Sequence, residues 1–368
     1  MKPEAIKVTV VIPTYERRAQ LLRCLLYWAE YPVNLIIMDG STLPTLQEVD
    51  VNRLDRVTYV HLPKSFEDRL CIGAAMVRTP YAMFLSDDEF ILNSGLISAC
   101  EVMDFDPEVS AVLGRTLIFA TFKGNMLADF YYESASNLNI NSASPLERFR
   151  ERLQVPENVI FYSLTRTNTL QLAGKFIAER KYSCPYVSEH QVEAIFCAAG
   201  KVVVLPRVFW LRNLDTPPVS ITGWDRLVKF KNWIVDASHS DEISYLLQSA
   251  DRHLAVANSD VQNITGEEFL SELKKIALRS RNNHLSFLYK VKLMFNRGFK
   301  FLPGWIRNFV RGLRRSIRSH PPKGLKPIYQ LIKEIEGQMS IDINDLLRIK
   351  KVVEGRDDQS TTSARNVR

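Results

Sequence analysis

Long apolar runs are absent from this sequence of 368 residues. No stretch reaches the roughly 18 consecutive apolar residues that a membrane-spanning helix needs, which excludes an integral span. The mostly apolar run Val8–Ile12 is too short for the core of a secretory signal, and charged residues soon follow it. We therefore expect a protein that is neither secreted nor membrane-spanning.

Cysteine is also scarce, with five residues and no C-x-x-C pair. An odd number of widely spaced cysteines predicts neither a zinc site nor a disulfide framework. A chain of this length does not need disulfides to be stable. The expected arrangement is a set of buried thiols in a reducing cytoplasm.

Acidic residues are missing from one long stretch. Between Leu273 and Lys333 the sequence has 16 Lys and Arg and no Asp or Glu, although the whole chain carries a formal net charge of only +7. The rest of the chain is therefore net acidic. Such an asymmetry indicates an anionic surface as a partner of the basic segment.

The composition, 46% apolar and 24% charged, is typical of a folded chain with one large domain and an appendage. We predict a main domain over residues 1–250 and a helical, basic, amphipathic extension over 251–353. The polar tail over 354–368 is expected to be disordered.

The first hundred residues alternate between apolar runs and helical stripes. Strands are expected at Val8–Ile12, Val33–Met38, Val57–Leu62 and Tyr81–Leu85. Helical patterns lie between them, and Ser65 is placed as the N-cap of the second. Strand, helix and strand with short links predict an α/β fold with a mainly parallel sheet flanked by helices.

The pattern is less regular further along the chain. Residues 111–122 and 201–205 are expected to be strands, and residues 188–199 a short helix. Residues 212–223 are rich in turn formers and predict a loop or a lid.

Polar residues follow the carboxyl ends of three predicted strands, where open parallel sheets bind ligands. These residues are Pro13, Thr14, Tyr15 and Glu16, then Asp39, then Asp87, Asp88 and Glu89. Three adjacent carboxylates repel one another unless a cation neutralises them, and Mg²⁺ or Mn²⁺ suits oxygen ligands. Because Mg²⁺ is usually shared with phosphates, a diphosphate ligand is the next inference. Each motif alone also fits a solvated turn, but their shared edge favours a site.

The runs V-T-V-V-I-P-T-Y-E-R, I-I-M-D-G-S and T-P-Y-A-M-F-L-S-D-D-E-F resemble the nucleotide-sugar half of a family-2 glycosyltransferase with the GT-A fold. The resemblance covers about residues 6–95 and extends more weakly to about 210. It implies contacts of Pro13, Thr14, Tyr15 and Glu16 with the nucleoside, a hydrogen bond from Asp39 to the base, and a contact of Arg69 with the diphosphate. It also implies metal binding by Asp87 and Asp88, with Glu89 as a third acid where the family has Asp.

The family's catalytic base lies in an E-D pair about eleven residues before a glycine that opens a strand. Here Ser188-Glu189 precedes Gly200 at that spacing, so the resemblance implies Glu189 as the base, with Ser in place of the first acid. Glu193, one helical turn further, is the alternative. An ordinary solvated carboxylate remains possible for either residue.

The resemblance implies inverting transfer of a sugar from a nucleotide sugar, with a UDP-sugar as first expectation, to a glycan or lipid-linked acceptor, as in surface-polysaccharide assembly. Two alternatives stay open: an inactive nucleotide-sugar-binding protein of the same fold, and a sugar-phosphate nucleotidyltransferase. The second usually has a glycine-rich basic loop after its first strand, which this chain lacks.

The segment 285–318 combines large aromatic residues at helical spacing with nine Lys and Arg and no acid. Such a pattern is typical of helices in a membrane interface. Packing of the aromatic face on the main domain and nucleic-acid binding are the alternatives. No nucleic-acid motif accompanies the charge, so we expect no nucleic-acid partner. The expected location is cytoplasmic and peripheral on the inner face of the cell membrane, and the oligomeric state is left open.

Overall fold

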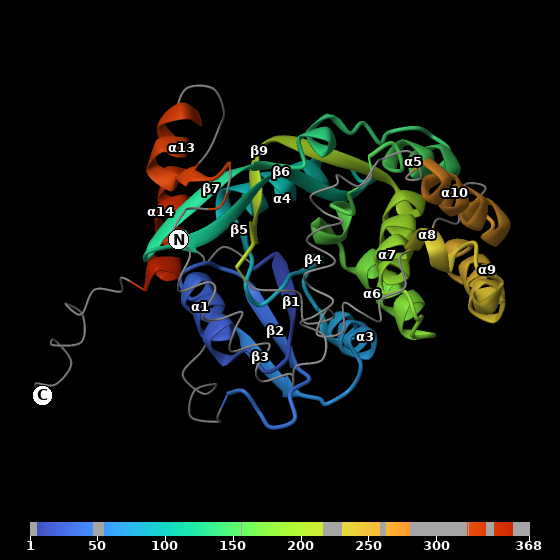
Figure 1. The fold of residues 1–368 in the computed structure, drawn as a ribbon, viewed down its shortest axis with the longest axis horizontal. Coiled ribbons are helices and arrows are strands. Elements are labelled where there is room, and N and C mark those ends of the chain that lie inside the picture. The colour runs from blue at the N-terminus through green and yellow to red at the C-terminus, as the bar shows by residue number, and fades with distance from the viewer. Residues whose placement is uncertain are drawn as a thin grey trace, which may run out of the picture.

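The structure is a computed structural model that describes residues 6–46, 55–155, 157–215, 230–257, 263–279, 322, 324–335 and 342–355. Within these residues, ten strands form one sheet with helices around it (Figure 1). The main path of the sheet is β10-β7-β6-β8-β4-β1-β2-β3, and β9 joins at the side by pairing with β5 and β6. The predicted α/β class is confirmed.

The elements follow one another along the chain with few long gaps. The strands are β1 (Val8–Thr14), β2 (Asn34–Asp39), β3 (Val57–His61), β4 (Tyr81–Phe84), β5 (Phe90–Ile91), β6 (Val109–Phe122), β7 (Asn125–Tyr131), β8 (Leu164–Arg166), β9 (Lys201–Asn213) and β10 (Lys326–Pro327). The helices are α1 (Arg18–Trp28), α3 (Phe66–Met76), α4 (Asn93–Phe105), α5 (Pro145–Arg152), α6 (Thr167–Ala178), α7 (Tyr186–Ala199), α8 (Phe230–Trp233), α9 (Ser240–Leu254), α10 (Gly266–Arg279), α13 (Ile328–Ile335) and α14 (Ile343–Glu354). Short 3₁₀ turns are η1 (Glu133–Asn137), η2 (Ile160–Tyr162) and η4 (Ala237–His239).

The N-terminal half of the sheet is parallel, as predicted. β1 lies between β2 and β4, and β3 pairs with the other edge of β2. Val10, Val11 and Ile12 of β1 are fully buried, as a strand covered on both faces requires. In this register Thr14 lies beside Asp39, so the strand ends meet at one edge.

The second half of the sheet is mixed, whereas the prediction was mainly parallel. β8 is antiparallel to β4 and β6, and β7 is antiparallel to β6 and β10. Lys123 and Gly124 join β6 to β7 with φ angles of 50° and 75°, the left-handed geometry that hairpin turns favour. β9 is longer than predicted and takes up the start of the expected loop 212–223, whose residues 216–223 lie outside the described residues.

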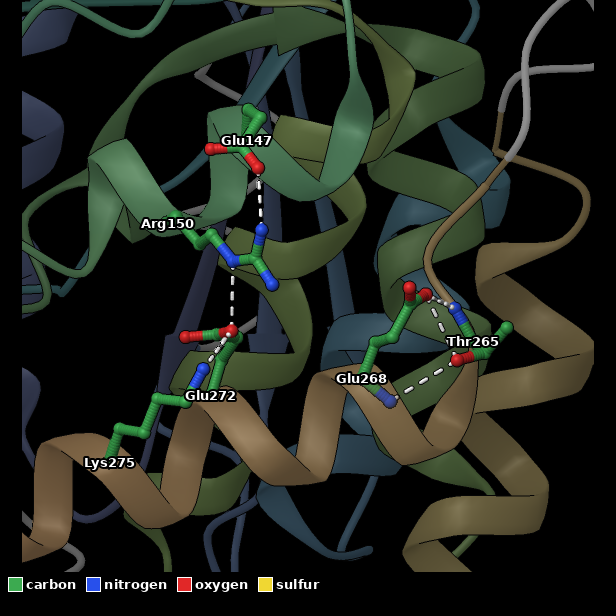
Figure 2. Close-up of polar contacts among 6 residues, drawn as sticks. All are labelled: Glu147, Arg150, Thr265, Glu268, Glu272 and Lys275. Atoms are coloured by element: carbon green, nitrogen blue, oxygen red, sulfur yellow. Dashed lines mark hydrogen bonds and ion pairs between the residues drawn. The ribbon is translucent and has the colours of Figure 1, made fainter.

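Helices α5, α7, α9 and α10 gather on one side of the molecule (Figure 1). The predicted domain boundary at residue 250 is wrong, because it falls inside α9. Arg150 of α5 joins this layer by ion pairs with Glu147 and with Glu272 of α10, the latter at 2.9 Å from Nε (Figure 2). Helix α10 therefore packs on the main domain.

The start of α10 is fixed by a capping box. The Glu268 N–H donates to the Thr265 hydroxyl oxygen at 3.2 Å, and the Glu268 carboxylate accepts the Thr265 N–H at 2.9 Å (Figure 2). This exchange satisfies two N–H groups that a helix start otherwise leaves unpaired.

The last elements of the predicted extension also belong to the main domain. β10 pairs with β7, and α14 packs against α1. Figure 1 shows α13 and α14 beside β7 and α1, far from α10. The basic segment 285–318 and residues 356–368 of the predicted disordered tail lie outside the described residues.

None of the described helices has both the length and the apolar character needed to cross a membrane. All five cysteines are unpaired; Cys71 is partly exposed and the other four are buried.

We predict that Asp345→Ala lowers the free energy of unfolding by about 2 kcal/mol. The buried Asp345 carboxylate accepts hydrogen bonds from the Tyr31 hydroxyl and, at 2.9 Å, from the Ser94 N–H, and both donors would lose their partner. Urea unfolding measures the change. Glu101→Ala on the exposed face of α4 is the control, and an equal effect of both variants would contradict the anchoring role of α14.

Candidate functional site

The structure brings together the predicted residues at the ends of β1, β2 and β4. The Gly40 N–H donates to the Thr14 carbonyl at 3.0 Å, which joins the ends of β1 and β2. The Thr14 hydroxyl donates to Asp87 Oδ2 at 2.6 Å, which joins β1 to the loop after β4. Three segments that are distant in the sequence thus form one polar edge.

Asp39 lies buried at the centre of this edge. Its Oδ1 accepts the Ser41 N–H at 2.9 Å, and its Oδ2 accepts the Thr45 N–H at 2.7 Å and the Tyr59 hydroxyl. Burial alone would raise the pKa of Asp39, but these hydrogen bonds outweigh it and hold the pKa below its ordinary value. Asp39 is therefore a charged group that organises the loop after β2.

The segment after β1 is bonded to the same loop. The Glu16 N–H donates to the Ser41 hydroxyl oxygen at 2.7 Å, and the Glu16 carboxylate accepts the Thr42 N–H at 2.9 Å. Glu16 has a left-handed φ of 53°, which these two bonds hold in place. Pro13 is partly buried, whereas Tyr15 is 41% exposed and is available to a ligand.

Arg69 lies beneath the strand ends. It is buried, and its Nη1 donates to the carbonyls of Thr14 at 2.6 Å and Met38 at 2.9 Å. A Cβ atom on Gly40 would lie 2.6 Å from this guanidinium, so only glycine allows the approach. Arg69 therefore ties β1 to β2, and its contact with a diphosphate stays a prediction.

The acids after β4 are buried rather than exposed to bulk water. Arg17 Nη1 lies 2.9 Å from Asp87 Oδ1 and 3.3 Å from Asp88 Oδ2, so one guanidinium offsets both carboxylates. Burial raises the pKa of Asp87, against the opposing effect of Arg17. Within the described ranges, no three His, Cys, Asp or Glu side chains are arranged to hold a metal.

Glu89 points towards β9. Its Oε2 accepts the indole N–H of Trp210 at 2.9 Å, and Arg212 Nε lies 4.0 Å from its Oε1. Burial, with the negative charge of Asp88, raises the pKa of Glu89 to about 8. Glu89 is thus an acid that takes up a proton close to neutral pH.

Glu189 lies in the first turn of α7 and is partly buried. Burial raises its pKa to about 7, although a hydrogen bond from Asn158 opposes this effect. The alternative, Glu193, is fully buried and its Oε2 accepts a hydrogen bond from Arg152 Nε at 2.6 Å. Glu193 also accepts the Ile160 N–H, so both of its oxygens are engaged within the protein. Glu189 is the one of the two that fits a base.

Tyr162 in η2 links the acids after β4 to Glu189. Its ring stacks on Trp210 with a centroid separation of 4.2 Å, and Trp210 bonds Glu89. Burial and the nearby negative charges of Glu89, Glu189 and Asp88 raise the pKa of Tyr162. Asp88 and Glu89, which follow β4, and the predicted base Glu189 therefore all lie close to this side chain.

Sequence reasoning missed Arg17, Tyr59, Asn158, Tyr162 and Trp210. Arg17 directly follows the first strand-end motif, so its position was a usable signal. Asn158 and Tyr162 lie in an irregular stretch without periodicity, and only the fold brings them beside Glu189.

Residues 9–171 match the model of the family described as Glycosyl transferase family 2. The matched region contains β1, β2, β4 and the acids, and it ends before Glu189. The chain carries a family-2 glycosyltransferase domain, which confirms the predicted family and enzyme class.

Among solved structures, the chain is similar to TarS of S. aureus. The crystal structure of TarS 1-349 is 14% identical with a TM-score of 0.48, over 84% of this chain and 80% of that one. TarS 1-349 in complex with UDP-GlcNAc gives a TM-score of 0.45 at 14% identity, over 69% of this chain and 74% of that one. These likenesses are too distant to support an argument about substrates. No curated protein matches the chain.

We predict that Arg17→Gln destabilises the protein by on the order of 3 kcal/mol at pH 8, because it removes the guanidinium that forms ion pairs with two buried carboxylates. The loss shrinks at pH 5, since the raised pKa of Asp87 lets the folded protein take up a proton before the unfolded chain does. Urea unfolding at the two pH values measures this difference.

Arg78→Gln is the matched control, because Arg78 is exposed and precedes β4 at the opposite edge of the sheet. An identical loss of stability at pH 5 and pH 8 for Arg17→Gln would show that Arg17 does not act through charge.

Proposed function

We propose that the enzyme transfers a sugar from a nucleotide-sugar donor, with a UDP-sugar as first expectation, to a hydroxyl of a glycan or lipid-linked acceptor with inversion. The observation that supports this best is that Glu189 and two of the acids after β4, Asp88 and Glu89, all lie close to the single side chain of Tyr162. One group can accept a proton while the other acids lie where a diphosphate departs.

The donor's nucleoside is assigned to the edge formed by Pro13, Thr14, Tyr15, Glu16 and Asp39. Tyr15 offers an exposed ring, and Asp39 is a buried, charged carboxylate at the same edge. A charged carboxylate is an acceptor that suits an N–H of the base.

A divalent ion, Mg²⁺ or Mn²⁺, is proposed at Asp87 and Asp88, with Glu89 as the third acid beside them. The donor oxygens fit this choice, because Mg²⁺ is commonly held by one or two carboxylates together with phosphates and water. Such a site does not need three protein ligands. When bound, the ion supplies positive charge where the nucleoside diphosphate leaves.

Glu189 acts as the general base in this proposal. It takes the proton of the acceptor hydroxyl while that oxygen forms the new bond at the anomeric carbon. The bond to the diphosphate breaks in the same displacement, and the leaving group departs with the electron pair. A pKa of about 7 suits the role, because half of Glu189 is then unprotonated at neutral pH.

We predict that Glu189→Gln lowers kcat by about 100-fold or more, because the amide cannot take up the proton, while the affinity for UDP stays unchanged. Asp88→Ala should instead weaken UDP binding in the presence of Mn²⁺. Calorimetry with UDP and a hydrolysis assay with a UDP-sugar panel measure the two effects.

Glu101→Gln on the exposed face of α4 serves as the control for both variants. Normal turnover of Glu189→Gln would overturn the assignment of the base. If the unmodified protein binds UDP but hydrolyses none of the UDP-sugars, it is instead the inactive nucleotide-sugar-binding protein.

We also propose that the enzyme is cytoplasmic and bound to the inner face of the membrane through 285–318. The support is its aromatic residues among nine Lys and Arg, together with the unpaired cysteines of the chain. A lipid-linked acceptor would be presented at the same surface.

We predict that the full chain floats with anionic liposomes at low salt and that replacing Arg311, Arg314, Arg315 and Arg318 by Gln weakens this binding. Each cation contributes about 1 kcal/mol near such a surface. The full chain is needed, because truncation before β10 would remove elements that pack on β7 and α1. The same four residues changed to Lys are the control, and equal flotation of the Gln variant would refute the proposal.

A further inference from the structure

A buried ion pair lies beneath the proposed base. Arg152 of α5 and Glu193 of α7 are 1% and 0% exposed, and Arg152 Nε donates to Glu193 Oε2 at 2.6 Å. Arg152 Nη1 donates to the Val155 carbonyl at 3.0 Å, and Glu193 Oε1 accepts the Ile160 N–H at 3.0 Å. The pair therefore fixes α5, α7 and η2 to one another.

Asn158 connects this ion pair to Glu189. Arg152 Nη2 donates to Asn158 Oδ1 at 2.5 Å, and Asn158 Nδ2 donates to Glu189 Oε2 at 2.7 Å. A guanidinium can only donate hydrogen bonds, so Arg152 forces the amide oxygen towards itself. The amide NH₂ must then face Glu189.

The orientation of Asn158 has a consequence for the carboxylate of Glu189. A donor at Oε2 favours the unprotonated carboxylate and prevents its rotation. Glu189 Oε1 has no partner among the described residues, so it is the oxygen left for an acceptor hydroxyl. The other titratable or charged groups near Glu189 are Glu193, His190, Arg152, Tyr162 and Cys184.

We infer that Asn158 is a positioning residue for the reaction: the Arg152–Glu193 pair orients its amide, and the amide holds Glu189 with Oε1 directed to the acceptor. This inference rests on the proposed function, in which Glu189 is the base. Asn158 is neither one of the acids after β4 nor one of the residues that the sequence predicted for the site.

The test compares Asn158→Asp with Asn158→Ala in the full-length enzyme. Asp has the shape of Asn and keeps an oxygen for Arg152, but it places a like charge beside Glu189 in place of a donor. Activity requires unprotonated Glu189, so kcat falls as the pH is lowered through the pKa of Glu189. Loss of the donor raises that pKa, and the acidic limb of the kcat profile moves to higher pH.

We expect the midpoint of the limb to rise by about one pH unit in Asn158→Ala and further in Asn158→Asp. At pH 7 kcat should fall by about fivefold in Asn158→Ala and by more in Asn158→Asp, while the affinity for UDP stays within twofold, because the proposed nucleoside edge is untouched. Asn125→Asp at the exposed β6–β7 turn is the charge-matched control and should keep the original profile.

Thermal melting checks that each variant is folded. If Asn158→Ala does not fold, the profile of Asn158→Asp tests the inference, because Asp retains the contact with Arg152. An unshifted profile in the folded variants overturns the inference. Glu189→Gln is measured in parallel: if it turns over normally, the proposed base fails, whereas an inactive Glu189→Gln beside unshifted Asn158 variants refutes only the positioning role.

Discussion

Parallel pairing of β1 with β2 and β4 is the constraint on which the site depends. It places Thr14, Asp39 and Asp87 at one edge, where their side chains are buried by the surrounding loops. Burial of several carboxylates is costly unless donors or cations accompany them. Arg17, the Thr14 hydroxyl and the N–H groups of the loop after β2 supply these partners.

The buried carboxylates fall into two groups with different chemistry. Asp39 receives enough hydrogen bonds to remain charged, and it stabilises the loop after β2. Glu89 and Glu189 receive fewer and have pKa values of about 8 and about 7. Titration near neutral pH is thus concentrated where a diphosphate would leave and a hydroxyl would attack, as is common in active sites.

The sequence predicted what depends on local pattern. Apolar β-branched runs identified the strands of the parallel half, and the polar residues after them lie together at one edge, as predicted. Partners such as Arg152 and Glu193, 41 positions apart, could not be paired without the fold. The domain boundary was misplaced because the basic composition of the C-terminal segment does not reveal that α9 and α10 pack on the main domain. The hairpin of β6 and β7 was missed because its turn has Lys where Asn or Asp is usual.

Helix α14, near the C-terminus, packs against α1, near the N-terminus, and this affects how the molecule folds during synthesis. Tyr31 follows α1, and its hydrogen-bond partner Asp345 lies 314 positions later. During synthesis β1, β2 and β4 emerge early, while the surface of α1 that α14 covers stays uncovered until almost the entire polypeptide has emerged. Nascent chains are therefore exposed to chaperones and to premature association through α1 for most of their translation.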